Sequence, residues 1–199
     1  MTSAQGSQRK SIGRRIAGGL LRLAGWHLVF RAPPAARAVV VFYPHTSNWD
    51  FVIGILARSA LDFPVRWAGK DTLFRWPFAG LLRHLGGIPV NRRQTSGLVG
   101  QLCQQFARAD TLYLAIAPEG TRSRTEHWKS GFYHLARAAG VPLGLAFIDY
   151  ARREIGVDTY LETTGDVSAD LAALGDYYAT KRGRHPHLQG PIRFRSDPG

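Results

Sequence analysis

The sequence contains one cysteine and few acidic residues for its length. Because Cys103 is the only cysteine among 199 residues, no disulfide can form within the chain, which fits a reducing compartment. All 14 Asp and Glu residues lie at or after Asp50, whereas 26 Lys and Arg residues bring the formal net charge to +12. An excess of this size favours an anionic partner, such as a phosphate-bearing substrate, an acidic lipid surface or nucleic acid.

The sequence also lacks a long apolar run and a metal-binding pattern. A membrane-spanning helix needs about 20 mostly apolar residues, whereas the apolar stretch at residues 16–30 is short and is interrupted by Arg22. A cleaved signal peptide is the alternative, because Arg14-Arg15 precedes this stretch and residues 36–38 loosely resemble a cleavage site. Arg22 in the middle of the stretch argues against it. The seven histidines are scattered, so no metal site is expected.

Residues 11–31 have the spacing of an amphipathic helix. Apolar side chains recur at steps of three or four and define one stripe, formed by Ile12, Ile16, Leu20, Leu23, Trp26 and Phe30. A helix of this kind lies in the membrane interface with its arginines near the headgroups. We therefore predict peripheral association with an anionic membrane, and a helix packed on its own domain is the alternative. Residues 1–10 are polar and basic and are predicted to be a disordered tail.

Residues 32–183 alternate apolar strands with helical segments. The predicted strands are residues 38–43, 65–68, 88–90, 111–117, 142–148 and 153–160, the last pairing with the one before it. The predicted helices are residues 50–61, 77–85, 97–108, 130–139 and 166–182. This alternation predicts one α/β domain with a central, mostly parallel or mixed sheet flanked by helices. Residues 184–199 are rich in Pro, Arg and Gly and are predicted to be an irregular tail.

His45 and Asp50 follow the strand predicted at residues 38–43. A histidine can remove a proton near neutral pH, and a carboxylate can hold the imidazole in one tautomer. Because Asp50 enters a helix, the intervening loop can fold back and pair the two side chains. Ser47 is an alternative nucleophile, but it does not lie in a G-x-S-x-G turn. A base with its orienting carboxylate needs fewer assumptions.

A second segment, residues 86–93, places Arg92 and Arg93 shortly after two glycines. Adjacent arginines can bind phosphate or carboxylate, and glycines let the backbone approach a ligand closely. Considered alone, the segment is better explained as a turn followed by a solvated basic pair.

A third segment, residues 117–124, follows the strand predicted at residues 111–117. It brings together Glu119, Gly120, Thr121 and Arg122. Hydroxyl groups and arginines in one loop suit a phosphoryl-bearing acceptor, whereas an ordinary polar loop is the alternative.

In this order and spacing, the segments resemble the glycerolipid and lysophospholipid acyltransferase superfamily, in particular a compact bacterial branch of the 1-acylglycerol-3-phosphate acyltransferase-like proteins. The superfamily has blocks of the form H-x-x-x-x-D, G-x-I-x-x-x-R and P-E-G-T-R-S, followed by an apolar block with proline. Here they correspond to residues 45–50, 86–92, 118–123 and 141–143. The resemblance covers about residues 38–150.

The resemblance implies that His45 is the general base and Asp50 its orienting partner. It implies a substrate-binding set of Arg92, Arg93, Glu119, Gly120, Thr121 and Arg122. The implied reaction moves a fatty acyl group from acyl-CoA or acyl-carrier-protein to a hydroxyl of a lysophospholipid or related lipid acceptor. It uses no cofactor, no metal and no acyl-enzyme. We expect the protein at the cytoplasmic face of the inner membrane, attached peripherally.

The sequence departs from the superfamily at Ala117, where an aromatic residue is usual, and at Pro89 and Asn91. These departures leave the His45–Asp50 pair intact but leave the identity of the acceptor open. A thioesterase that uses water as acceptor, or a non-catalytic protein that binds lipid or nucleic acid, are the alternative functions. Basic charge alone supports the last of these, so no nucleic acid is expected as a partner.

Overall fold

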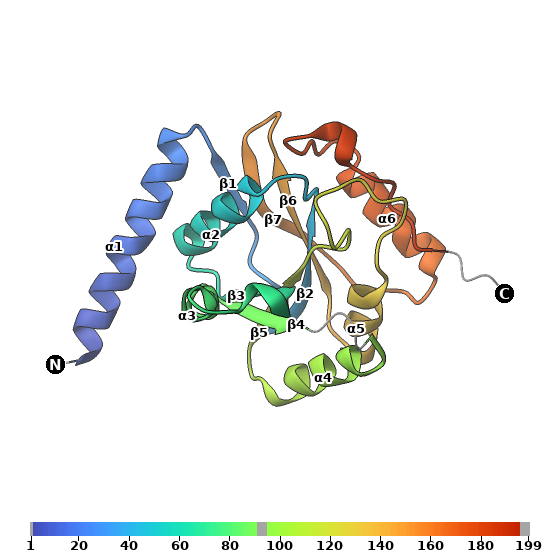
Figure 1. Cartoon of the computed structure of the whole chain (residues 1–199), viewed down its shortest axis with the longest axis horizontal. Helices are drawn as coiled ribbons and strands as arrows, with labels where there is room; N and C mark the ends of the chain where they lie inside the picture. Colours follow the sequence, from blue (N-terminus) through green and yellow to red (C-terminus); the bar gives the residue numbers. More distant parts are fainter. Residues whose placement is uncertain (1, 91–94, 196–199) are drawn as a thin grey trace.

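The computed structural model describes residues 2–90 and 95–195, without the side chains of residues 2–11 and 95–98. Within this part of the chain, one mixed sheet has helices on both faces (Figure 1). The strands are β1 (His27–Phe30), β2 (Arg37–Tyr43), β3 (Val65–Lys70), β4 (Gly87–Val90), β5 (Leu112–Ile116), β6 (Leu143–Asp149) and β7 (Glu154–Leu161). The α-helices are α1 (Thr2–Leu23), α2 (Trp49–Leu61), α3 (Ala79–His84), α4 (Thr95–Arg108), α5 (Gly131–Ala139) and α6 (Val167–Tyr178). The short 3₁₀ helices are η1 (Asp71–Leu73) and η2 (Pro186–Leu188). The predicted α/β class is confirmed.

The strand order is β1-β7-β6-β2-β5-β3-β4. All neighbouring strands are parallel except β6 and β7, which form the predicted antiparallel pair. Strand β2 lies in the middle, between β6 and β5, and its carboxyl end leads directly into the loop that carries His45. The fold thus puts this loop at the edge of the sheet where α/β proteins bind their ligands.

The side chains of β2 alternate between two apolar layers. Val39, Val41 and Tyr43 pack into the layer that contains α4, α5 and α6. Ala38 and Val40 face the opposite layer, which contains Phe63, two residues after the end of α2. A strand that is buried on both faces needs a continuous apolar run. The apolar run of β2 therefore fits its position in the middle of the sheet.

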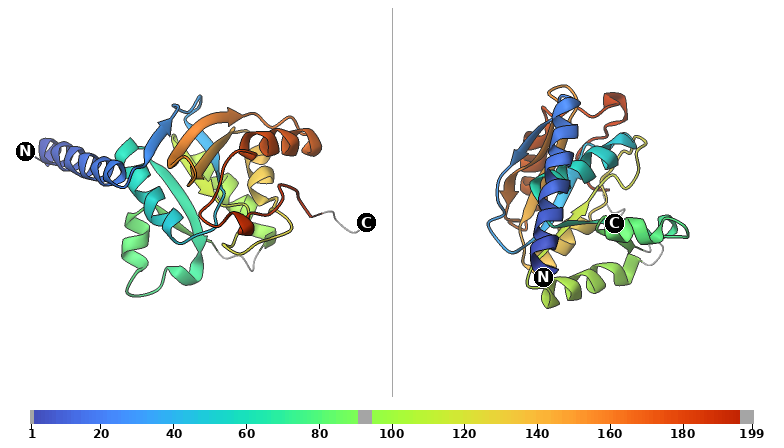
Figure 2. Two further views of the ribbon diagram at one scale, coloured as in Figure 1. Left: turned by 90° about the horizontal axis from the view of Figure 1, so that it is seen from above. Right: turned by 90° about the vertical axis from the view of Figure 1, so that its left-hand side faces the viewer.

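Helix α1 packs one face against α2 and leaves another exposed. Ala17 and Leu21 are buried beside Ala57 and Ala60 of α2, and the Nε atom of Arg14 donates to the carbonyl of Ala60 at 3.1 Å. The predicted apolar stripe lies on the outside, where Ile12, Ile16, Leu20 and Leu23 are exposed. The N-terminal part of α1 extends beyond the rest of the domain (Figure 2). One face of the helix is thus packed on its own domain, while association of the exposed stripe with a membrane stays a prediction.

The predicted helix boundaries at residues 11 and 31 are wrong. Helix α1 already includes Thr2–Lys10, which were expected to be a disordered tail, and it ends at Leu23. Gly25 has a φ of 75°, the left-handed conformation that ends many helices. His27–Phe30 then form β1, which pairs with β7, and Trp26 is buried rather than on the exposed stripe.

The C-terminal residues 184–195 are largely irregular, as predicted, but they are packed against the domain. Phe194 contacts the rings of Phe132 and Tyr133 in α5, and its backbone forms a bridge with Trp128. The carbonyl of Gly190 accepts from the hydroxyl of Tyr43 at the end of β2. This segment is therefore part of the same structural unit as residues 32–183.

Candidate functional site

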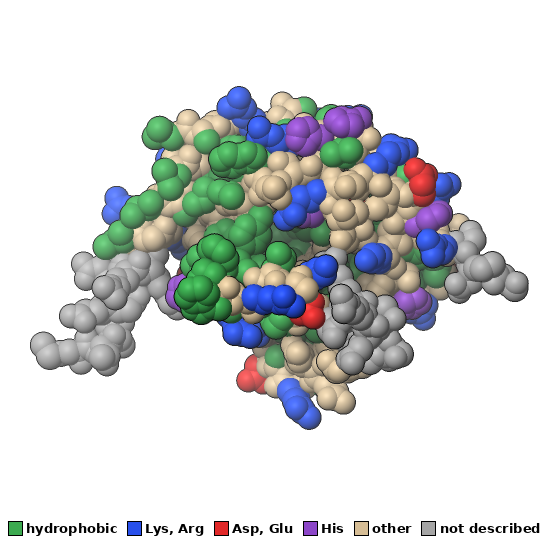
Figure 3. All heavy atoms as spheres, in the orientation of Figure 1, with side chains coloured by type: hydrophobic (Ala, Val, Ile, Leu, Met, Phe, Trp, Pro, Cys, Tyr) green, Lys and Arg blue, Asp and Glu red, His purple; other side chains and the backbone are tan. Residues whose placement is uncertain are grey.

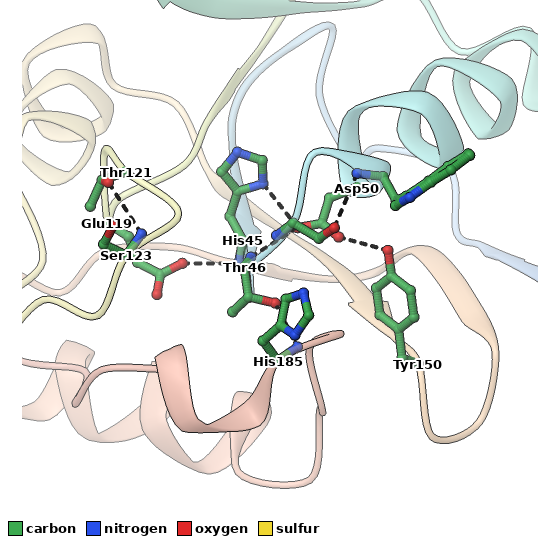
Figure 4. A network of polar contacts seen from close by, with 10 residues as sticks. His45, Thr46, Asp50, Glu119, Thr121, Ser123, Tyr150 and His185 are labelled. Atoms are coloured by element: carbon green, nitrogen blue, oxygen red, sulfur yellow. Dashed lines mark hydrogen bonds and ion pairs between the residues drawn. The ribbon is translucent and has the colours of Figure 1, made fainter.

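His45 and Asp50 lie together at the carboxyl end of β2 (Figure 4). His45 is in the loop after β2, and Asp50 is in the first turn of α2, where a negative charge is favoured by the helix dipole. The Nδ1 atom of His45 is 3.2 Å from the Oδ2 atom of Asp50, although the two groups are not aligned as a straight hydrogen bond. The structure thus brings the predicted pair into ion-pair distance.

The carboxylate of Asp50 is held by the loop that it faces. Its Oδ2 atom accepts from the backbone N–H groups of Thr46 at 2.9 Å and Ser47 at 2.8 Å. Its Oδ1 atom accepts from the hydroxyl of Tyr150 at 2.8 Å. With 1% of its surface exposed, Asp50 is a buried acid that needs these donors, and they fix its orientation towards His45.

A cavity of about 190 Å³ extends from this pair beneath α2. His45, Asp50 and Arg58 are its charged or titratable lining residues, and the rest of its lining is apolar or glycine. Arg58 donates to the carbonyl of Val65 at 2.7 Å, so one charged group in the cavity already has a backbone partner. The cavity therefore combines an apolar interior with a potential base at one end.

Glu119 is buried behind the His45 loop rather than exposed. Its Oε2 atom accepts from the backbone N–H of His45 at 2.9 Å, and 2% of its surface is exposed. Burial raises the pKa of Glu119 to about 7, which hydrogen bonds from the backbone N–H groups of His45 and Gly190 partly oppose and the charge of Asp50 reinforces. In this structure Glu119 ties the His45 loop to the C-terminal segment, and its predicted contact with the acceptor stays a prediction.

The raised pKa of Glu119 predicts a pH dependence of stability. Between its ordinary pKa of 4.5 and about 7, the folded protein binds a proton that the unfolded chain has lost. Wild-type stability should therefore fall as the pH rises through this window, by at most roughly 3 kcal/mol. Glu119→Gln cannot bind this proton, so its free energy of unfolding should not fall in this way. In urea unfolding, the difference in stability between the variant and wild type should therefore shift in favour of the variant from pH 4.5 to 8. Parallel stability curves would contradict the assignment.

The polar residues that follow Glu119 in the third segment are largely at the surface of the same loop. Thr121 is exposed and its hydroxyl accepts from the backbone N–H of Ser123, and the side chain of Arg122 is exposed. Gly120 has a φ of 66°, and a Cβ atom there would come within 2.9 Å of the side chain of Lys129. Arg92 and Arg93 lie outside the described residues, directly after the end of β4 at Val90.

The glycines at the start of the second segment have structural reasons of their own. Gly86 has a φ of 88° and forms the turn between α3 and β4. At Gly87, a Cβ atom would come within 2.7 Å of the rings of Phe74 and Trp67. Close aromatic packing therefore accounts for Gly87 without a ligand.

Two groups near the site were missed by the sequence analysis. Tyr150 follows β6, the parallel neighbour of β2, so its position at the same sheet edge was a usable signal. The backbone N–H of His185 donates to the hydroxyl of Thr46 at 3.2 Å (Figure 4). No local pattern in residues 184–195 indicates this contact, because it joins positions far apart in the sequence.

Metal ligands are not grouped in the described part of the chain. Across residues 2–90 and 95–195, no cluster of three or more His, Cys, Asp or Glu side chains could hold a metal ion. The described residues of the site are a histidine beside a buried carboxylate at one end of an apolar cavity.

Comparisons with known proteins find related sequences. The 1-acyl-sn-glycerol-3-phosphate acyltransferase of Escherichia coli (strain K12) is 31% identical over 136 residues, which cover 63% of this chain and 54% of that protein. The Haemophilus influenzae protein of the same name is 29% identical over 139 residues, 65% of this chain and 56% of that protein. The match thus spans about half the length of these relatives.

A solved structure shares the fold. The 1-acyl-sn-glycerophosphate (LPA) acyltransferase PlsC from Thermotoga maritima superposes with a TM-score of 0.56 at 15% sequence identity, covering 90% of this chain and 80% of that one. The family model described as Acyltransferase matches residues 29–144, a region that contains His45, Asp50 and Glu119. The resemblance inferred from the sequence blocks is therefore confirmed, and the chain belongs to the acyltransferase family.

Proposed function

We propose that this protein transfers a fatty acyl group from an acyl thioester to a hydroxyl of 1-acylglycerol-3-phosphate or a related lysophospholipid. The observation that carries the proposal is the His45–Asp50 pair at one end of the apolar cavity. The donor is acyl-CoA or acyl-carrier-protein, and the reaction needs no cofactor. The names of the two relatives described above, both 1-acyl-sn-glycerol-3-phosphate acyltransferases, support the choice of acceptor class.

In the proposed mechanism, His45 acts as general base. With Nδ1 directed at Asp50, the other ring nitrogen is free to take the proton from the acceptor hydroxyl. The oxygen then attacks the thioester carbonyl, the tetrahedral intermediate collapses, and the thiolate leaves and takes a proton from the imidazolium. Asp50 stabilises the positive charge that forms on His45 during attack. Holding acceptor and thioester together at this base supplies much of the rate enhancement.

The cavity beneath α2 is proposed to hold the acyl chain of the donor. Its lining includes Phe51 and Ile55 of α2 and Trp67 of β3, which offer apolar surface next to His45. Each CH₂ group buried there contributes about 0.8 kcal/mol to binding. The length of this cavity should therefore influence which acyl chains are accepted.

Filling the cavity at Gly54 should shorten the preferred acyl chain. Gly54 lines the cavity from α2, and a Cβ atom added there meets no other atom within 4 Å. Gly54→Leu should lower kcat/KM for long chains relative to short ones by about tenfold or more. Gly175→Leu, at a similarly open glycine of α6, is the matched control. An unchanged chain-length preference in the Gly54 variant would contradict the assignment.

Association with an anionic membrane surface is proposed for the face that surrounds the cavity. Figure 3 shows hydrophobic side chains gathered over α1, α2 and the α3 region on this face, with Lys and Arg side chains nearby. The exposed members are Ile12, Ile16, Leu20, Leu23, Trp49, Val52, Leu73, Trp76, Phe78 and Leu81. Among the described residues, no helix is long and apolar enough to cross a bilayer. A peripheral position at the cytoplasmic face of the inner membrane would bring the cavity to its lipid substrates.

Replacing the stripe on α1 should weaken membrane binding. Truncation before Ala32 is unsuitable, because Leu21 and Trp26 are buried in the core. The triple variant Ile16→Ser, Leu20→Ser and Leu23→Ser keeps those contacts and should bind anionic vesicles about tenfold or more weakly in co-sedimentation. Val167→Ser, at an exposed apolar residue of α6, should bind like wild type. Equal binding by both variants would show that α1 is not the anchor.

The direct test of the proposed reaction separates transfer from hydrolysis. Purified protein is incubated with labelled acyl-CoA or acyl-carrier-protein and with 1-acylglycerol-3-phosphate, and the labelled products are resolved. We expect labelled diacylglycerol phosphate. Labelled free fatty acid, formed at the same rate with and without acceptor, would support the thioesterase alternative instead.

A further inference from the structure

We infer that Tyr150 is a positioning residue for the catalytic pair, and that it acts by fixing the carboxylate of Asp50. This inference rests on the proposed function, because it assigns a role within that reaction. Tyr150 lies outside residues 29–144, the region that the family model matches. The role is therefore inferred from the geometry of this structure.

Asp50 contacts both Tyr150 and His45 and thereby connects them (Figure 4). The hydroxyl of Tyr150 donates to Oδ1 of Asp50 at 2.8 Å, while Oδ2 lies 3.2 Å from Nδ1 of His45. The two carboxylate oxygens thus have different partners. One is held by Tyr150, and the other faces the base and the N–H groups of the loop. Without Tyr150, Oδ1 would lose its donor, and the rotation of the carboxylate about the bond to Cβ would depend on the two N–H groups at Oδ2 alone.

Tyr150 itself is held by elements on both sides of the site. The ring of Trp26, just after α1, meets it edge-on at a centroid distance of 5.0 Å. Its backbone N–H donates to the carbonyl of Arg182 at 2.8 Å. Residues from the two ends of the chain thus hold Tyr150 at its ring and at its backbone. The position of the ring is therefore fixed before substrate binds. A preorganised donor of this kind needs no rearrangement during the reaction.

Burial and the contact with Asp50 keep the hydroxyl of Tyr150 a donor. Burial and then the hydrogen bond to Asp50 raise the pKa of Tyr150 well above its usual value, and Arg184 opposes this shift. The guanidinium of Arg184 also lies 5.9 Å from the centre of the Trp49 ring. The carboxylate of Glu119 contacts the pair indirectly, because it accepts from the backbone N–H of His45. Tyr150 thus keeps its proton throughout the neutral range and can donate it in the hydrogen bond to Asp50.

The chain contains a matched control for this interaction. The hydroxyl of Tyr133 donates to Oδ2 of Asp170 at 2.8 Å, and that carboxylate also accepts from the backbone N–H groups of Thr164 and Gly165. The arrangement repeats that of Tyr150 and Asp50, but it lies between α5 and α6, in the layer opposite the cavity. Tyr133→Phe therefore removes an equivalent hydrogen bond without touching the site.

The first measurement compares steady-state kinetics of Tyr150→Phe and Tyr133→Phe. Tyr150→Phe should lower kcat by about tenfold with little change in either KM. Tyr133→Phe should keep kcat, even where its thermal unfolding midpoint falls as much as that of Tyr150→Phe. A kcat for Tyr150→Phe equal to wild type, or a loss confined to stability, would overturn the inference.

The second measurement asks whether Tyr150 acts through Asp50. In the Asp50→Asn background, Tyr150→Phe should cause no further loss of kcat in single-turnover acyl transfer, because the carboxylate it positions is gone. An additional tenfold loss in that background would show an effect independent of Asp50 and would overturn the inference.

A third measurement does not depend on activity. The ring-nitrogen NMR signals of His45, assigned by their loss in His45→Gln, should change in Tyr150→Phe and stay unchanged in Tyr133→Phe. Unchanged His45 signals in Tyr150→Phe would contradict positioning. If wild type fails to transfer acyl groups to any acceptor, the proposed function fails, while the NMR comparison still decides the role of Tyr150.

Discussion

Replacing His45 with glutamine is expected to lower kcat for acyl transfer by about 10²–10⁴-fold, the usual loss when a general base is removed. The side chain is partly buried and its ring contacts Asp50, but the loop is held by backbone hydrogen bonds. The fold should therefore survive the substitution. Steady-state kinetics together with the thermal unfolding midpoint check both parts of this prediction.

A histidine away from the site provides the control. His134 is exposed on α5, on the other side of the sheet, and His134→Gln should keep wild-type kcat. Near-normal turnover by His45→Gln would show that another group removes the proton, and the proposed mechanism would then be wrong.

Replacing Asp50 with asparagine is expected to lower kcat by about 10²-fold or more. The amide keeps the shape of the carboxylate, and its oxygen can still accept from the N–H groups of Thr46 and Ser47. It lacks the negative charge that stabilises the imidazolium form of His45 while the acceptor is attacked. The loss should therefore appear in kcat, with smaller changes in the two KM values.

Asp170 separates this catalytic effect from a loss of stability. It is as buried as Asp50 and accepts from a tyrosine hydroxyl and from backbone N–H groups. Asp170→Asn should lower the free energy of unfolding by an amount similar to that of Asp50→Asn and leave kcat unchanged. Equal kcat losses in both variants would mean that Asp50 matters only for folding.

The central part of the fold could be predicted because its signals are local. The run of apolar residues in β2 and the alternation of strands and helices after it require no knowledge of distant contacts. The same holds for the proximity of His45 and Asp50, since a strand end and a helix start within six residues leave the loop few ways to fold. Their catalytic role stays a prediction until the variants are measured.

The error at the end of α1 has a physical explanation. Trp26 and Phe30 continue the helical spacing by coincidence, whereas β1 exists because it pairs with β7, whose residues lie more than a hundred positions later. Gly25 was the local signal that the helix ends. Tyr150 and the C-terminal segment reach the site through equally distant contacts, which periodicity in the sequence cannot reveal.

The most direct test of the central claim is product identification with purified wild type and His45→Gln. Each protein is incubated with labelled acyl-CoA or acyl-carrier-protein and a total lipid extract in vesicles, and the labelled lipids are separated and identified. The account predicts that wild type esterifies the label to a lysophospholipid-type acceptor, and that His45→Gln forms at least about 10²-fold less of this product. Label found solely in free fatty acid, or the same labelled lipid formed equally by both proteins, would contradict it.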